Sequence, residues 1–312
     1  MKEYVHEILK GDVRSIARLI TLVENNESEA IPSMKKIHNH TGKAHVIGVT
    51  GVMGSGKSSL IFELAYHFRK KHKKVGIIAV DPTSPFSGGA LLGDRIRMMK
   101  LSADDGVFIR SMGTRGTVGG LASSVYDVVE ILDAAGMDII LVETVGVGQD
   151  QVDIIKIADT TLVVLVPGLG DSIQTIKAGL MEIADIFVVN KSDRPGSEQT
   201  IAELEALLDI SSKKDRVTPI ITTSTKEQKG ISKLVTAIGQ HLHYLQKTKK
   251  LDIQRRTRYE AELIEIIRKR LMTLIFDESK IKNEINTLVN EISQKKIDPY
   301  SASEEILQGI LR

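Results

Sequence analysis

The stretch VIGVTGVMGSGKSSL (residues 46–60) decides the fold of this 312-residue chain. A strand-like run at residues 46–50 leads into GVMGSGKS (residues 51–58), and a helical pattern follows from Ser59. This order of strand, glycine-rich loop and helix fits the phosphate-loop pattern. Glycines allow the backbone to wrap closely around phosphate oxygens, and the amino end of the helix adds partial positive charge. The sequence therefore predicts a phosphate-binding site here.

The polar side chains of this loop have separate expected roles. Lys57 would reach the β- and γ-phosphates, and the hydroxyl of Ser58 would be a ligand of Mg²⁺. We expect the nucleotide to be bound by Gly51, Val52, Met53, Gly54, Ser55, Gly56, Lys57, Ser58 and Ser59.

Six further apolar runs follow along the chain and alternate with helical patterns. Most are continuously apolar, which is typical of strands that are covered on both faces. The alternation predicts an α/β fold with a doubly wound, mostly parallel sheet, in which ligands bind beyond the carboxyl ends of the strands. The runs lie at residues 75–80, 107–109, 139–142, 161–166, 186–189 and 219–222.

The helical segments at the two ends predict three parts: an N-terminal helical extension (1–42), the α/β domain (43–246) and a C-terminal helical arm (247–312). The first part carries a helical pattern from about Asp12 to Asn25, with Asp12 as its cap. The arm is consistent either with a cap folded onto the sheet or with packing against a second subunit. Its two apolar stripes are Tyr259, Leu263, Ile266, Ile267, Leu271 and Leu274, and then Ile281, Ile285, Leu288 and Ile292.

The segment NKSD (residues 190–193) follows the run at 186–189 and predicts guanine recognition. The carboxylate of Asp193 would accept from guanine N1–H and from the exocyclic amine, a donor pair that adenine lacks, so the site would reject ATP. The stem of Lys191 would cover the base, and Asn190 would tie this loop to the phosphate loop. The segment 223–226, after the next run, is placed to supply a backbone N–H to guanine O6, so Ser224, Thr225 and Lys226 are expected to bind the nucleotide.

Three carboxylates are candidates for the chemistry between the two loops. Asp81 ends the run at 75–80 and Asp94 follows it; both could bind Mg²⁺, which prefers hard oxygen ligands. Glu143 opens ETVG (residues 143–146), the acidic-x-x-Gly pattern of a switch loop. Because Glu replaces the Asp that is more usual at this position, Glu143 could orient a water molecule instead of holding the metal ion. A helix cap or a surface ion pair is the alternative for each of these residues.

Other polar segments give weaker signals. Arg115, in a glycine-rich loop, could contact phosphate or a partner, or belong to a plain connection. The pairs His38/His40 and His241/His243 lack a third ligand at suitable spacing, which argues against a metal site.

Composition sets limits on the class of protein. With 42 basic and 40 acidic residues, the formal charge is +2, which gives no reason to expect nucleic acid or an anionic membrane as a partner. The absence of cysteine excludes disulfides and thiolate zinc sites. No apolar run approaches the roughly 20 residues of a membrane helix. We expect a cytoplasmic protein.

Several longer segments make the resemblance specific. They are VDPTSPFSGGALLGDRIR (80–97), RSMGTRG (110–116), ETVGVGQ (143–149) and PGLGD (167–171). With them the chain resembles the MeaB-type GTPases, also described as ArgK or LAO/AO transport kinases. The resemblance covers nearly the whole chain.

This resemblance implies a Mg²⁺-dependent GTPase that cycles between GTP and GDP and serves as a chaperone of a cobalamin-dependent acyl-CoA mutase. It would gate cobalamin loading and protect a mutase of the methylmalonyl-CoA type. The resemblance implies that Asp81 and Asp94 support Mg²⁺ and hydrolysis, that Glu143 lies in the second switch, and that residues 168–177 form an extra switch with Lys177 as its cation. It also implies a homodimer joined through the C-terminal helices.

Two other functions compete with this one. A kinase for a periplasmic amino-acid-binding protein is disfavoured by the guanine motif. A metal-delivery GTPase for nickel enzymes is disfavoured because the chain has neither His-rich tracts nor cysteine.

Overall fold

The structure is a computed structural model, and it divides into two compact units, Met1–Arg258 and Tyr259–Arg312. The residues that it describes are 2–25, 27–81, 101, 103–113, 120–144, 154–168, 180–210, 216–277 and 279–310. The division falls inside α12 (Lys250–Asp277). The three parts expected from the sequence, 1–42, 43–246 and 247–312, remain a prediction. The N-terminal helices belong to the first unit because they share its hydrophobic core.

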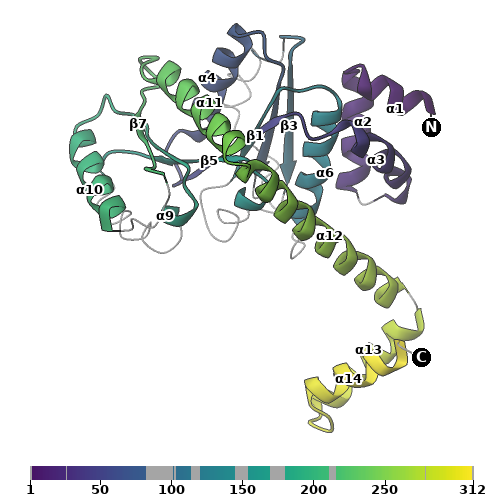
Figure 1. Cartoon of the computed structure of the whole chain (residues 1–312). Coiled ribbons are helices and arrows are strands. Elements are labelled where there is room, and N and C mark those ends of the chain that lie inside the picture. The colour runs from purple at the N-terminus through teal and green to yellow at the C-terminus, as the bar shows by residue number, and fades with distance from the viewer. Residues whose placement is uncertain are drawn as a thin grey trace. The chain divides into compact units, whose positions relative to one another are not determined.

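A seven-stranded sheet forms the centre of the first unit (Figure 1). All neighbouring strands pair in parallel, in the order β3-β2-β4-β1-β5-β6-β7. Each of the seven predicted runs is one of these strands, so the α/β prediction is confirmed. The strands are β1 (His45–Gly51), β2 (Val75–Asp81), β3 (Val107–Gly113), β4 (Ile139–Glu143), β5 (Thr160–Leu165), β6 (Ile186–Val189) and β7 (Ile220–Thr222).

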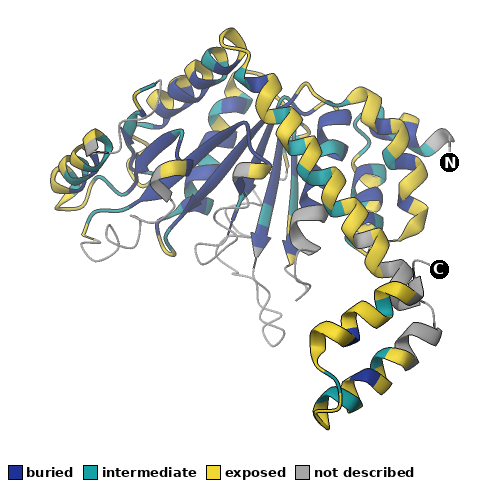
Figure 2. Ribbon diagram, turned by 60° about the horizontal axis from the view of Figure 1, so that its bottom comes forward, coloured by how far each residue is buried: buried dark blue, intermediate teal, exposed yellow. Residues whose placement is uncertain are grey.

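Helices cover both faces of the sheet, and the strands between them are buried (Figure 2). One core cluster joins the sheet to α1 (Lys2–Leu9), α2 (Val13–Glu24), α3 (Ile31–Ile37) and α6 (Gly120–Ala134). A second cluster joins the opposite face to α4 (Lys57–Lys70) and α11 (Ile231–Lys247). A third, smaller cluster lies around Phe187 and Leu204. The other helices of this unit within the described residues are α9 (Leu180–Ile183), α10 (Ser197–Ile210) and 3₁₀ helices at Ser28–Ala30, His38–His40 and Ile154–Lys156.

Local signals account for the helix boundaries. Asp12 caps α2 as predicted, with its carboxylate accepting from the Ser15 N–H at 2.7 Å. Hydrogen bonding from Ser15 holds the pKa of Asp12 below its ordinary value. The helix after the phosphate loop begins at Lys57, two residues before the predicted start, because Gly56 in the left-handed region ends the loop. The sequence analysis did not predict α1.

The second unit is helical. α13 (Ser279–Ser293) and α14 (Pro299–Ile310) follow the last part of α12, and Leu288 and Ala302 are buried. Several apolar side chains of α12 are exposed, among them Leu263, Ile267 and Leu271. Among the described residues, no helix is long and apolar enough to cross a membrane.

Two glycines offer a matched test of the packing. A Cβ at Gly48, in β1, would lie 2.6 Å from Ile154 Cγ1 and 3.0 Å from Ala158 Cβ, whereas a Cβ at the exposed Gly239 of α11 would meet nothing within 4 Å. We therefore expect Gly48→Ala to lower the free energy of unfolding by about 1–3 kcal/mol. Gly239→Ala should raise it by about 1 kcal/mol, since alanine favours a helix interior. Denaturant unfolding measures both values, and equal effects of the two changes would refute the packing at Gly48.

Candidate nucleotide site

The predicted site residues that the structure describes gather at one edge of the sheet because parallel strands end on the same side. The phosphate loop follows β1, Glu143 ends β4, and the NKSD segment follows β6. The segment from Thr223 to Lys226 follows β7. Four separate parts of the sequence thus converge on one region.

The phosphate loop depends on two glycines. Gly51 has φ 140°, and a Cβ there would lie 2.1 Å from Val164 O. Gly56 has φ 86°, and a Cβ there would lie 2.7 Å from Asn190 Nδ2. Any side chain at either position would disrupt the loop or the neighbouring base loop. The amino end of α4 has no side-chain cap, so its first turn can offer backbone N–H groups to an anion.

Lys57 lies folded against its own loop. Its ammonium group donates to Gly51 O at 3.1 Å and to Val52 O at 3.2 Å, and the residue is 8% exposed. Burial lowers the pKa of Lys57, while the charge of Glu143 acts in the opposite direction. A bound phosphate would restore stabilisation of the charged ammonium, so the position suits a phosphate ligand.

Ser58 and Glu143 are in direct contact. The Ser58 hydroxyl donates to Glu143 Oε1 at 2.7 Å. Two oxygen atoms that could be metal ligands therefore lie side by side near the start of α4. Oxygen donors of this kind fit Mg²⁺. Asp81 ends β2 at the same edge of the sheet, but its side chain lies outside the described residues, as do Asp94, Lys177 and Arg115.

Asn190 joins the base loop to the phosphate loop, as the sequence predicted. Its side chain is fully buried and donates from Nδ2 to Ser55 O at 2.8 Å, while Oδ1 accepts from the Thr223 hydroxyl at 3.1 Å. Lys191 adds a second link, from Nζ to Gly54 O at 2.6 Å, with its backbone at φ 56°. The two halves of the site therefore have a fixed relative position.

Asp193 is held by a contact that the sequence analysis did not predict. The Ser224 hydroxyl donates to Asp193 Oδ1 at 2.7 Å and itself accepts from the Glu227 N–H at 3.2 Å. The bond from Ser224 is the main cause that holds the pKa of Asp193 below its ordinary value, and Lys226 contributes in the same direction. Asp193 is thus ionised and oriented, as an acceptor for two donors must be. Thr225 and the exposed Lys226 follow in the turn after β7.

Three buried hydroxyls near the phosphate loop have no hydrogen-bond partner within the described part of the protein: those of Thr50, Ser55 and Thr144. An unpaired buried hydroxyl costs about 1–3 kcal/mol, so such groups are typical of a site that a ligand completes. The sequence analysis missed Thr50 and Thr144. Thr50 ends the apolar run at 46–50 and Thr144 follows Glu143 in ETVG, and neither position carries a local pattern that predicts an unpaired hydroxyl.

The histidine pairs take part in other contacts. His38 Nδ1 lies 2.8 Å from Glu130 Oε1, and the buried His241 contacts the Thr160 hydroxyl at 2.9 Å. Within the described ranges, no group of three or more His, Cys, Asp or Glu side chains is arranged to hold a metal ion.

Comparison with known proteins places these features in a family. Residues 16–280 match the family model described as methylmalonyl-CoA mutase-associated GTPase MeaB. A Pyrococcus abyssi protein named as a GTPase is 50% identical, and the alignment covers 99% of this chain and 96% of the relative. The mitochondrial methylmalonic aciduria type A homolog of Mus musculus is 28% identical, and the alignment covers 97% of this chain and 77% of the relative. The solved structure of an LAO/AO transport system kinase shares the fold, with a TM-score of 0.73 and 23% identity. The match covers 100% of this chain and 97% of that structure.

Removing the Ser224 hydroxyl tests the geometry of the base loop. In Ser224→Ala the pKa of Asp193 should rise toward its ordinary value, because the main hydrogen bond that favours the carboxylate is lost. Affinity for GTP should fall by about 10-fold, the effect of losing one hydrogen bond to a charged group. NMR titration and equilibrium nucleotide binding measure the two effects. Ser232→Ala, at an exposed position of α11, is the control; an unchanged pKa and affinity in Ser224→Ala would refute the role of Ser224.

Proposed function

We propose that this chain, which belongs to the family of methylmalonyl-CoA mutase-associated GTPases, is a chaperone of a cobalamin-dependent acyl-CoA mutase. The chain is a GTPase, as the names of its relatives state. In the proposed role it gates cobalamin loading and protects a methylmalonyl-CoA mutase. The observation that carries the nucleotide part of the proposal is the bond from Asn190 to Ser55 O, which joins the NKSD segment to the glycine-rich loop; in the proposed function these segments read guanine and bind the phosphates.

Binding of the triphosphate would use the charges already present at the loop. Lys57 would exchange its bonds to Gly51 O and Val52 O for bonds to phosphate oxygens. The uncapped amino end of α4 would donate backbone N–H groups to the same phosphates. Both interactions would strengthen as negative charge develops on the phosphate oxygens in the transition state. A phosphate loop lowers the activation barrier of hydrolysis in this way.

Mg²⁺ would be held by Ser58, Asp81 and Asp94, and when bound it would neutralise charge on the β- and γ-phosphates. Glu143 accepts from the Ser58 hydroxyl and so fixes the direction of its oxygen. The same carboxylate can orient a water molecule near the γ-phosphate, a role that a shortened side chain would lose. Lys177 would supply a further cation in the switch at 168–177.

Guanine selection would rest on Asp193. The Ser224 bond leaves the second carboxylate oxygen and the remaining lone pairs of Asp193 for guanine N1–H and the exocyclic amine. ATP would leave this carboxylate without its donors. This preference for GTP also disfavours a kinase that uses ATP.

We further propose a homodimer formed through α12. Its exposed apolar side chains recur at helical spacing and would be covered by a second copy of the chain. The residues concerned are Tyr259, Leu263, Ile266, Ile267 and Leu271, of which Leu263 is 58% exposed.

The test of the chaperone role is GTP hydrolysis by the full chain, alone and with methylmalonyl-CoA mutase from the same source. We expect slow hydrolysis alone and a rise of about 10-fold or more with the mutase, because a partner that contacts the switch residues can complete the catalytic site. Lys57→Ala should abolish hydrolysis in both cases. Hydrolysis that proceeds at the same rate with and without the mutase would contradict the proposed partner while leaving the GTPase intact.

The dimer is tested separately by its mass in solution. Leu263→Glu combined with Ile267→Glu should convert a dimer to a monomer, because each change places a charge in the proposed contact. Light scattering after size exclusion measures this. Arg268→Glu, on the opposite side of the helix by spacing and exposed, should leave the mass unchanged. A monomeric wild-type chain would rule out the dimer.

A further inference from the structure

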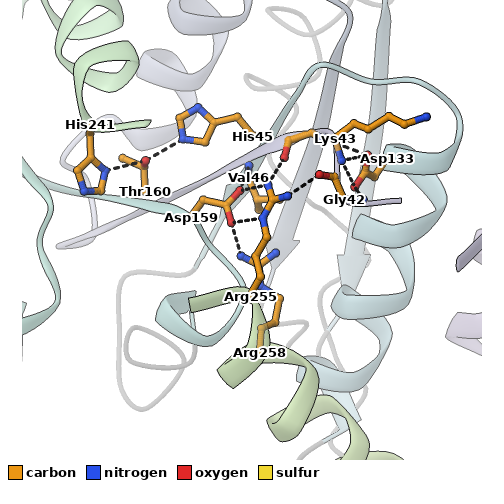
Figure 3. A network of polar contacts seen from close by, with 11 residues as sticks. Gly42, Lys43, His45, Val46, Asp133, Asp159, Thr160, His241, Arg255 and Arg258 are labelled. Atoms are coloured by element: carbon orange, nitrogen blue, oxygen red, sulfur yellow. Dashed lines mark hydrogen bonds and ion pairs between the residues drawn. The ribbon is translucent and has the colours of Figure 1, made fainter. Parts of the chain in front are cut away.

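A buried ionic cluster joins the first turns of α12 to the amino ends of β1 and β5 (Figure 3). The side chain of Asp159, directly before β5, is 0% exposed. Its carboxylate accepts from the Val46 N–H at 2.9 Å, from Arg255 Nη2 at 3.1 Å and from Arg258 Nη2 at 2.6 Å. Burial would raise the pKa of Asp159, but the two arginines outweigh burial and hold it below its ordinary value. One buried negative charge is therefore paired with two positive charges.

Arg255 also ties α12 to the backbone just before β1 (Figure 3). Its guanidinium group donates to the carbonyl oxygens of Gly42 and Ala44, the second at 2.8 Å. Of the two arginine side chains, that of Arg255 is the more exposed, at 18% against 11% for Arg258. Arg255 thus makes three contacts that attach α12 to the sheet, and it is the cation that lies closer to water.

Two buried histidines lie beside this cluster (Figure 3). His45, the first residue of β1, is 4% exposed, and its Nε2 lies 2.8 Å from the Thr160 hydroxyl. The same hydroxyl lies 2.9 Å from Nδ1 of His241 in α11. Since the hydroxyl of Thr160 has one proton, it can donate to one imidazole nitrogen and accept from the other. On its other side, His241 Nε2 lies 3.4 Å from Asp185 Oδ1, and the ring stacks on Tyr244.

The surroundings of His45 hold its ring neutral. Burial lowers the pKa of His45 from 6.5 to about 4; the charge of Asp159 opposes this shift, and that of Arg255 adds to it. The carboxylate of Asp138, directly before β4, bonds to Lys73 and to the Lys74 N–H. Because the pKa of His45 is lowered, the stability that its neutral form gives to the closed cluster is complete above pH 6.5. It is lost as the pH falls from 6.5 toward 4.

A proton on His45 would bring a third positive charge to the buried carboxylate of Asp159. A buried charge without a counter-charge is strongly unfavourable, so the closed cluster favours the loss of one cation to water. Arg255 can reach water with the smaller movement, because its side chain is the more exposed of the two. Its departure also removes the donor of the Gly42 and Ala44 carbonyl groups. These contacts are therefore lost together.

We propose that protonation of His45 releases Arg255 from Asp159 and so detaches the first turns of α12, residues 250–258, from the amino end of β1. The proton comes from solvent, and the open form binds it more tightly than the closed form. With a pKa of about 4 in the closed form and 6.5 in the open form, opening should become up to about 30-fold more favourable between pH 7.5 and pH 5.

Hydrogen exchange of the full chain at pH 7.5, 6 and 5 tests this release. Each rate is divided by the intrinsic rate of that amide at the same pH. In the wild type, protection of amides 250–258 should fall by about 10- to 30-fold between pH 7.5 and pH 5. In His45→Gln, which keeps a donor for Thr160 but cannot take up a charge, protection should not change with pH. His243→Gln, at an exposed position of α11, should behave as the wild type.

Amides of β5 at 162–165 report on the core of the same unit and should stay protected throughout. Arg255→Gln is the second variant, and it decides if His45→Gln does not fold: its amides 250–258 should exchange fast at every pH. Three results would overturn the proposal. They are equal wild-type protection of 250–258 at pH 7.5 and pH 5, a wild-type pH dependence that persists in either variant, and a parallel loss of protection in β5. The last result would mean that acid unfolds the whole unit.

Discussion

The common direction of all seven strands is the constraint on which the site depends. Since every neighbouring pair is parallel, the loops after β1, β4, β6 and β7 emerge at one edge, although the ends of β1 and β7, Gly51 and Thr222, lie 171 positions apart in the sequence. Within this frame, Asn190 fixes the base loop to the phosphate loop through Ser55. A nucleotide bound there would have its base and its phosphates read by segments whose spacing the protein sets in advance.

The opposite edge of the sheet has a different polar organisation. There Asp133 and Asp159 accept from the backbone before and within β1, and Arg255 and Arg258 come from α12. The strand that leads into the phosphate loop is therefore held at its start by charged side chains, and at its end the Gly51 carbonyl oxygen accepts from Lys57. The nucleotide site and the root of α12 share one strand.

The sequence predicted the sheet and the two nucleotide loops because their signals are local. A strand buried on both faces must be continuously apolar. The segments GVMGSGKS and NKSD are recognisable from consecutive residues alone. The contacts of Ser224 with Asp193, of Ser58 with Glu143 and of Arg258 with Asp159 join positions far apart in the sequence. Their pairing depends on strand register and helix docking, for which no local pattern exists.

Equilibrium binding of GTP, ITP and ATP to the full chain with Mg²⁺ tests the guanine site most directly. Asp193, oriented by Ser224, should favour GTP over ATP by roughly 10⁴-fold or more, since ATP leaves the carboxylate without donors. ITP, which keeps N1–H but lacks the exocyclic amine, should bind with intermediate affinity. Equal affinity for ATP and GTP would contradict the account, because the loops joined by Asn190 would then not read the base.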